Sequence, residues 1–470
     1  MPYQYVVALA FVLALFMDIL DVTIVNVSLF EISKDFGVSI GATTWIVLGY
    51  SLSLAIWIPI SGWLGDRFGT RRVFIFALVM FILASGLCAE ARTIEQLVGF
   101  RLLQGVGGGM LTPTGVTLLF RAFPPAERAK ASAVLTIPTV LAPATGPVLG
   151  GFLTDSFGWR WIFRVNIPIG LIALAVAYFG LRKEDITTKR PFDARGFVLA
   201  AIGFPAIVYG LERGAEEGWG SVRILGALGL AIVSLSALTF WSLRTPAPML
   251  DLGLLRERMF RTTNIVSFAS TMAFLGVVFI LPQFLQRVAG FTAFQSGLAT
   301  FPQAFGVVAM SKLAGSLYPK VGPRRMLAVA YFGLSLATVP FLFLTVDTNP
   351  WVIRSIMFIR GIFLAFTFIP LQAASYARIT PEQTGRASSI FSTQRQLGAA
   401  MGVAILSTVL LSNIPTEFGR GVVPLAERSG FTSAFHIAFA VAAGFTLLAG
   451  LLSLSIRDSD AAATMQPKPS

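Results

Sequence analysis

The sequence is poor in charge, cysteine and histidine. Only 13% of its 470 residues are charged, about half the share that is usual in soluble domains. The single cysteine, Cys88, excludes an internal disulfide and argues against a metal site built on cysteine ligands. The sequence contains no HExxH, Walker, GxSxG or CxxC pattern. It therefore predicts no catalytic residues, no metal and no cofactor.

Long apolar runs make up most of the chain. Hydrophobic residues account for 55% of it and the mean hydropathy is +0.76. A membrane helix needs roughly 20 apolar residues, and we count fourteen such runs between residues 5 and 456. The sequence predicts an all-α integral membrane protein, with the lipid bilayer as its main partner.

The basic loops predict how the helices are oriented. The net charge of +13 is explained by loops that orient membrane helices rather than by nucleic-acid binding, because Lys and Arg gather on the cytoplasmic side of membrane proteins. Most of them fall in alternate loops, such as those around residues 65–72, 182–195 and 320–325. We therefore expect a multi-pass protein of the cell (inner) membrane with both termini in the cytoplasm.

The sequence contains an internal repeat. Residues 315–325 align with residues 62–72 at an offset of 253, with Pro319 in place of the acid Asp66, and Arg360 echoes Arg101 at an offset of 259. Related halves around a central site are usual in secondary transporters. We expect two six-helix bundles over 1–182 and 256–457, an inserted helix pair over 195–244, and a disordered tail over 458–470.

The turn between the second and third runs combines glycines, one acid and three arginines. Its distinctive residues are Gly62, Asp66, Arg67, Gly69, Arg71 and Arg72. Glycines allow close backbone approach, and an acid can neutralise a neighbouring arginine or cap a helix N-terminus. The segment resembles the signature loop of the major facilitator superfamily. This resemblance implies the major facilitator fold and a gating role for the loop.

Two acids lie inside the first apolar run. Asp18 and Asp21 are three residues apart and so share one helix face. An acid near the bilayer centre costs on the order of 2.5–3.5 kcal/mol, which suggests a proton site, although either acid could instead lie solvated or salt-bridged near the interface. The segment from Leu20 to Val27 resembles the first-helix signature of the fourteen-helix drug:proton antiporter branch (EmrB/QacA type). That resemblance implies that Asp21 is the coupling carboxylate and Asp18 a helper.

An arginine lies inside the fourth run. Arg101, followed by Gln104 and a run of glycines, must find a carboxylate or water, or snorkel outward. The segment resembles the superfamily's RxxQGxG motif, which implies that Arg101 tunes the protonation of the acid in the first helix.

Three further segments resemble motifs of the same branch. Span five carries a stripe of small residues and prolines that resembles the antiporter motif, made of Ala142, Gly146, Pro147, Gly150 and Gly151. Such a stripe allows close helix packing, and the prolines favour bending; a role in packing alone stays open. The segment 158–168 resembles the WRWIFxxN pattern, which we interpret as an interfacial anchor. Residues 394–402 resemble the RQLGxxxG pattern of span thirteen.

The sequence says least about which substrate the protein binds. The candidate substrate contacts are Asn26, Trp45, Tyr50, Gln104, Met110 and Gln283, although Trp45 and Tyr50 are better interpreted as interfacial anchors. The expected function is proton-coupled export of lipophilic small molecules or drugs, organic cations among them, by alternating access, with protons, a small-molecule substrate and accessory efflux components as partners.

The sequence leaves one other function open and disfavours two. Export of a specific metabolite, antibiotic or lipid with weak or no proton coupling stays open. An intramembrane enzyme is disfavoured, because two acids one turn apart on one helix cannot flank a scissile bond. A non-transporting receptor would have no need of the Asp21 and Arg101 pair.

Overall fold

The computed structural model describes residues 2–183, 191–414 and 428–465, and every regular element among them is helical. The first part of the chain contains α1 (Tyr3–Phe36), α2 (Ile40–Phe68), α3 (Thr70–Ala89), α4 (Ile94–Ala122), η1 (Pro125–Glu127), α5 (Arg128–Phe157), α6 (Trp161–Arg164) and α7 (Asn166–Gly180). Two helices follow, α8 (Ala194–Glu217) and α9 (Val222–Arg244). The rest contains η2 (Leu252–Arg256), α10 (Arg258–Gln283), η3 (Phe284–Val288), α11 (Ala293–Thr300), α12 (Pro302–Val321), α13 (Pro323–Thr338), η4 (Val339–Phe343), α14 (Pro350–Ser375), α15 (Thr384–Ser412), α16 (Arg428–Ser453), η6 (Asp458–Ala461) and α17 (Ala462–Met465).

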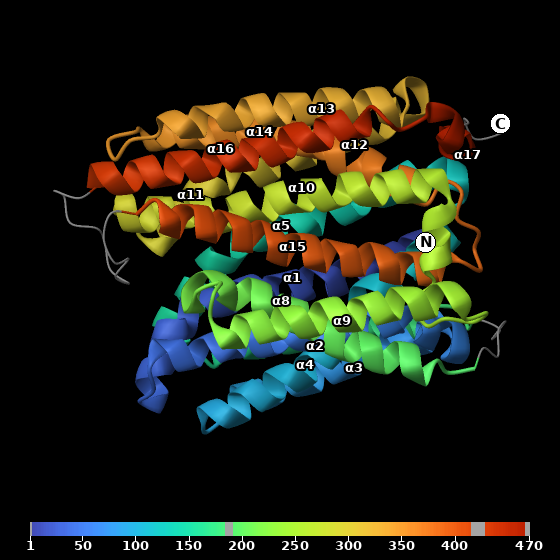
Figure 1. The fold of residues 1–470 in the computed structure, drawn as a ribbon, viewed down its shortest axis with the longest axis horizontal. Helices are drawn as coiled ribbons and strands as arrows, with labels where there is room; N and C mark the ends of the chain where they lie inside the picture. The colour runs from blue at the N-terminus through green and yellow to red at the C-terminus, as the bar shows by residue number, and fades with distance from the viewer. Residues whose placement is uncertain (1, 184–190, 415–427, 466–470) are drawn as a thin grey trace.

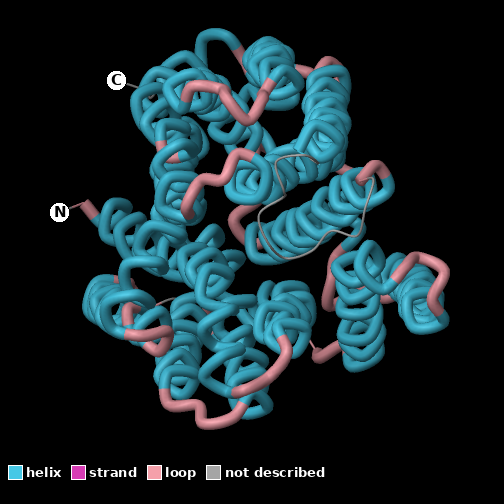
Figure 2. The backbone as a smooth tube through the Cα atoms, turned by 90° about the vertical axis from the view of Figure 1, so that its left-hand side faces the viewer, coloured by secondary structure: helices cyan, strands magenta, loops and turns pink. Residues whose placement is uncertain are grey.

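The helices form two groups that lie side by side with their axes roughly parallel (Figure 1). In the view along the helix axes, α8 and α9 lie at one side of the junction between the groups (Figure 2). Helix α8 packs against α2 of the first group and α15 of the second, and α9 packs against α8. We therefore keep the proposed division of the chain into two helix bundles, 1–182 and 256–457, and an inserted helix pair, 195–244.

The predicted count of fourteen spans is not confirmed. Eleven described helices are long and apolar enough to cross a membrane, or twelve when the bent helix α5 is taken as one span. Helices α4 and α12 are outside this count although they have 29 and 20 residues. Polar side chains and glycines make them less apolar, and both pack inside the bundle, α4 against α2 and α3, and α12 against α14 and α5.

The repeat seen in the sequence recurs in the backbone. Gly69 joins α2 to α3 with φ 90°, and Gly322 joins α12 to α13 with φ 82°. A residue with a side chain rarely adopts such angles, so both turns need glycine. Arg101 in α4 and Arg360 in α14 are also both buried.

The tail differs from the expectation of disorder. Asp458–Met465 forms η6 and the short helix α17, while residues 466–470 lie outside the described residues. Asp460 forms an ion pair of 2.7 Å with Arg378, and Asp458 accepts a hydrogen bond of 2.9 Å from the backbone of Arg324. The Tyr318 and Thr464 hydroxyls are 2.7 Å apart. These polar contacts with α12, α13 and the segment after α14 hold the tail in an ordered conformation, which its composition alone did not predict.

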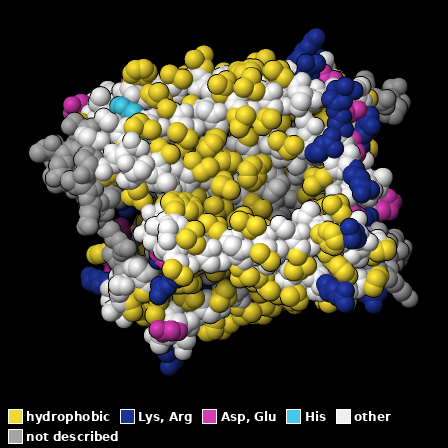
Figure 3. Space-filling view, in the orientation of Figure 1, with side chains coloured by type: hydrophobic (Ala, Val, Ile, Leu, Met, Phe, Trp, Pro, Cys, Tyr) yellow, Lys and Arg dark blue, Asp and Glu magenta, His cyan; other side chains and the backbone are white. Residues whose placement is uncertain are grey.

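The surface has an apolar middle and a basic end. In the face shown in Figure 3, hydrophobic side chains cover the central zone, and Lys and Arg gather mainly at the end where α17 lies. The two ends of the chain lie at this same end (Figure 1). By the positive-inside rule, we propose that this end faces the cytoplasm.

Cysteine labelling tests this orientation. In a Cys88→Ala background, Glu216→Cys should react with a membrane-impermeant maleimide added outside cells, because Glu216 is exposed at the end of α8. Lys183→Cys should react only after the membrane is permeabilised, because Lys183 follows α7 at the basic end. The reverse labelling pattern would overturn the orientation.

Candidate functional site

The centre of the first helix group contains a buried ion pair. The Asp21 carboxylate and the Arg101 guanidinium are 1% exposed or less and lie 2.5 Å apart. Asp21 also accepts hydrogen bonds from the Gln104 side chain at 3.0 Å and from the Asn166 side chain at 2.7 Å. Helices α1, α4 and α7 thus contribute to one polar cluster in an apolar bundle. All the contacts of the carboxylate are with donors, so the ionised form satisfies each of them.

Arg101 is anchored to the protein rather than to the membrane surface. It lies seven residues after Ile94, the first residue of α4, and its guanidinium also donates to the backbone carbonyl of Ile46 at 3.3 Å and to the side-chain amide oxygen of Gln104 at 2.7 Å. Outward snorkelling is therefore excluded in this conformation.

A second pair of groups joins Asp18 to the same cluster. The Tyr50 hydroxyl donates to Asp18 at 2.5 Å, and the Thr112 hydroxyl lies 3.5 Å from the other carboxylate oxygen. The Tyr50 ring lies under the Arg101 guanidinium, 4.2 Å from its centroid. Tyr50 is 2% exposed, so its interpretation as an interfacial anchor is wrong. It connects the two acids instead.

The glycines of α4 make this packing possible. A Cβ atom on Gly108 would lie 2.2 Å from the Tyr50 hydroxyl oxygen, and one on Gly105 would lie 2.4 Å from the Ser53 Cβ. Larger residues would push α4 away from α2 and separate Arg101 from its partners. The glycine run after Arg101 therefore positions the ion pair.

The small-residue stripe of α5 packs against the helix that carries the acids. A Cβ atom on Gly146 would lie 2.2 Å from the Thr23 hydroxyl, and one on Gly150 would lie 2.8 Å from the Ile24 side chain. Ala142 is fully buried, whereas a Cβ atom on Gly151 would meet nothing within 4 Å. Pro147 and its neighbour Val148 lie beside Gly297 of α11, so this part of α5 meets both helix groups.

The prolines of α5 accompany a bend, as the sequence predicts. The segment Pro125–Pro143, which is η1 with the first part of α5, meets the second part of α5, Thr145–Phe157, at an angle of 42°. Proline removes a backbone donor and clashes with the preceding turn, which explains the bend near Pro143 and Pro147.

The turn after α2 meets the second helix group. Asp66 lies 3.6 Å from the Arg121 guanidinium of α4 and 3.7 Å from that of Arg386 in α15. Gly62 donates its backbone N–H to the Ser389 hydroxyl at 2.8 Å, and a Cβ atom there would lie 2.7 Å from the Gly385 carbonyl. The two groups of helices are therefore in contact at the basic end.

Other residues of this turn have different surroundings. Arg71 donates to the Tyr178 carbonyl of α7 at 2.6 Å, and Arg72 is exposed. Arg67 is half-buried at the end of α2, and Gly69 forms the positive-φ turn. Of the predicted gating loop, it is Gly62 and Asp66 for which the structure records contacts with the second helix group.

The candidate substrate contacts do not form one site. Gln104 and Tyr50 belong to the ion-pair cluster, and Met110 is fully buried in the apolar core. Asn26 is exposed on α1 and bonds to its own helix at 3.2 Å. Trp45, 41% exposed, packs against Tyr209 of α8, and Gln283 bonds to its own helix at 3.3 Å. The sequence pattern that suggested these six residues therefore did not predict which of them are close in space.

Sequence reasoning missed the role of Asn166. The sequence predicts an anchor over 158–168, and the start of the segment fits that prediction: Trp159 and Arg160 both donate hydrogen bonds to Asp35 at 2.9 Å. Asn166, however, begins α7 and reaches Asp21 and the Ser85 hydroxyl. An amide amid apolar residues was the available signal, but its partner lies 145 residues away in the chain.

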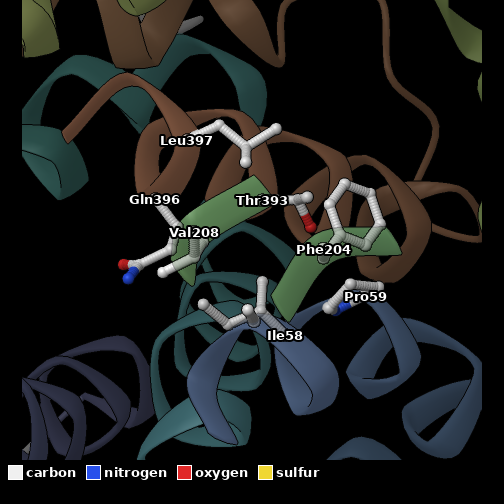
Figure 4. A pocket seen from close by; sticks show the side chains of 8 residues that line it. Ile58, Pro59, Phe204, Val208, Thr393, Gln396 and Leu397 are labelled. Atoms are coloured by element: carbon white, nitrogen blue, oxygen red, sulfur yellow. The ribbon is translucent and has the colours of Figure 1, made fainter. Parts of the chain in front are cut away.

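A small cavity lies between the helix groups and the inserted pair. Its volume is only about 10 Å³, with Ile58 and Pro59 of α2, Phe204 and Val208 of α8, and Gln396 of α15 among its lining residues (Figure 4). Within the described residues, no cluster of three or more His, Cys, Asp or Glu side chains could hold a metal.

Known proteins resemble this chain over most of its length. Residues 11–403 match the Major Facilitator Superfamily. The chain is 34% identical over 405 residues to the Multidrug resistance protein B homolog of Mycobacterium tuberculosis, covering 85% of this chain and 75% of that protein. It is 32% identical over 413 residues to the Multidrug export protein EmrB of Escherichia coli, covering 86% and 80%.

Solved structures share the fold. The human organic anion transporter MFSD10 superposes with a TM-score of 0.66 over 96% of this chain and 100% of that one, at 14% identity. At that identity the likeness concerns the fold alone. The sequence matches and the paired helix groups lead to one conclusion: the chain belongs to the Major Facilitator Superfamily of transporters.

Proposed function

We propose that this chain is a proton-coupled exporter of lipophilic, cationic small molecules that works by alternating access in the inner membrane of a bacterium. The buried Asp21–Arg101 pair is the observation that carries the proposal. Relatives named multidrug export and multidrug resistance proteins, at 32–34% identity, support export of lipophilic compounds. Protons, the small-molecule substrate and accessory efflux components are the proposed partners.

Asp21 is the proposed proton carrier, because protonation changes the bonding of its whole cluster. An ionised carboxylate accepts from Arg101, Gln104 and Asn166 together. A proton on Asp21 removes the negative charge that pairs with Arg101, and a buried charge left without its partner costs about 3–5 kcal/mol. Protonation therefore destabilises the contact between α1 and α4 and favours an arrangement in which Arg101 meets water or another acceptor, and deprotonation restores the contact.

Within its described residues, the second helix group lacks an equivalent of this pair. Arg360 donates to the Thr338 hydroxyl and lies over the Phe341 ring, 5.2 Å from its centroid. No ion pair recorded among the described residues involves Arg360. This difference supports a coupling site in the first helix group alone, with Asp18 and Tyr50 as helpers.

Asp66 is the proposed gate residue. Its carboxylate lies between one guanidinium from each helix group, so it favours the state in which the basic end is closed. Arg386 also bonds to Asp251, which extends the contact to the segment before α10. The α5 stripe supports the same motion, because close packing on α1 at Thr23 transmits movement of α1 to a helix that also touches α12 and α14.

The coupling role of Asp21 is tested with a neutral isostere. In proteoliposomes, Asp21→Asn should abolish uphill transport driven by a pH gradient, because asparagine cannot carry the proton, while the substrate still binds. Asp18→Asn should change the pH dependence of transport more mildly. The measurement is accumulation of a panel of lipophilic cations with only the pH gradient imposed.

Asp35→Asn is the matched control for this experiment. Asp35 lies on the same helix but pairs with Arg160 at the outer end and is 44% exposed, so its removal should leave uphill transport within about twofold. Accumulation by Asp21→Asn against a concentration gradient would show that Asp21 is not the coupling site. Downhill transport with no response to pH in the unaltered chain would favour the alternative of weakly coupled export of a specific metabolite, antibiotic or lipid.

The gate is tested by separating rate from affinity. Asp66→Asn should lower the transport rate several-fold, because the closed state at the basic end loses its charge pairing, while the KM stays within about threefold. Arg72→Gln, an exposed change in the same loop, should leave both values nearly unchanged. A tenfold higher KM with an unaltered rate would contradict the gate and indicate a substrate contact.

A further inference from the structure

The inserted helix α8 carries an acid that the coupling cluster does not use. Glu212 lies in α8 and is half-buried. Its carboxyl group lies near the Ser51 hydroxyl of α2. Ser51 follows Tyr50 in the chain, and it lies roughly 16 Å along α2 from Ile40 at 1.5 Å per residue. Glu212 is therefore inside a membrane span, although it lies only about 8 Å from Glu217, the last residue of α8.

The contacts along α2 and α8 show what surrounds this acid. Trp45 packs on Tyr209, three residues before Glu212, and Arg213 donates to the Thr44 hydroxyl at 3.2 Å. Val208 lies one helical turn before Glu212, on the same face, and lines the cavity between α2, α8 and α15 (Figure 4). Glu212 thus lies close to an aromatic pair and to an apolar cavity.

Neighbouring charges do not neutralise Glu212. Arg213 bonds to Glu216 and Glu217, each at 2.9 Å, and none of the ion pairs recorded among the described residues includes Glu212. From α15, Arg386 pairs with Asp66 and Asp251 at the basic end, and the ion pairs recorded among the described residues do not include Arg395, the other arginine of α15. Residues 41–65 of α2 contain no charged side chain. An acid at this depth that lacks a basic partner suggests a functional role.

We propose that Glu212 is a selectivity residue that binds the positive charge of a monovalent organic cation, whose apolar body lies against the α2–α8–α15 cavity. This assignment rests on the proposed export function and adds a site on the inserted helix pair to it. A hard metal cation needs six or more oxygen ligands, whereas one carboxyl and one hydroxyl are present here. A lipophilic cation needs only one counter-charge, because apolar side chains can contact the rest of it.

Two ligands of similar shape test the role of charge. Methyltriphenylphosphonium is a cation and triphenylphosphine oxide is neutral. In purified protein, the unaltered chain should bind the cation at least tenfold more tightly than the neutral compound. Glu212→Gln should reduce this ratio to threefold or less, because the counter-charge is lost. Glu216→Gln, an exposed change on the same helix, should keep the ratio.

A labelling experiment on the unaltered chain provides a second measurement that does not depend on the folding of the variant. Dicyclohexylcarbodiimide reacts with protonated carboxyl groups in apolar surroundings. Methyltriphenylphosphonium should slow its addition to Glu212, followed by peptide mass spectrometry, and triphenylphosphine oxide should not.

Two outcomes would overturn this role of Glu212: an unchanged ratio in Glu212→Gln, or equal binding of the two ligands by the unaltered chain. Failure of the unaltered chain to accumulate any lipophilic cation under a pH gradient would instead reject the proposed function. The two failures are therefore distinguishable.

Discussion

The buried contact between Asp21 and Arg101 is the interaction on which the first helix group depends. Two charges that are 1% exposed or less are tolerated in an apolar bundle only when each is paired and hydrogen-bonded. Gln104, Asn166 and the Ile46 carbonyl supply the remaining bonds. The glycines of α4 and the small residues of α5 then allow the neighbouring helices to approach closely enough to enclose the pair. The helices around the Asp21–Arg101 pair pack closely because the two charges must be shielded from the apolar membrane.

A contact of this kind gives a transporter two discrete states. A buried pair is stable when both partners are ionised, and a proton on the acid removes the attraction in one step. Packed helices shift between arrangements rather than deform continuously, so a local change at α1 and α4 can alter how the two groups of helices meet. At the basic end, Asp66 and Gly62 already join α2 to α15, and α5 touches both groups. The proposed proton site and the proposed gate are thus linked by continuous helices.

The inserted pair α8 and α9 is part of the same assembly. Because α8 packs on both α2 and α15, any relative movement of the two groups must change at least one of these contacts. Ser51 and Tyr50 are adjacent on α2, so Glu212 and Asp18 lie on different sides of one helix at similar depth. This placement allows a substrate charge and a proton to act on the same helix without sharing a carboxylate.

The sequence by itself determined the class of protein and the main charged residues. Apolar runs specify membrane helices through their length alone, and the loop after α2 and the Asp21 and Arg101 motifs identified the family because they are local in the chain. It did not determine that Tyr50 and Asn166 complete the cluster, that Asp458–Met465 is ordered, or that Glu212 lies beside α2. Each of those features depends on a partner far away in sequence, such as Asn166 with Asp21 across 145 residues. Local pattern cannot specify such pairs, because only the packing of whole helices decides which polar groups meet inside the membrane.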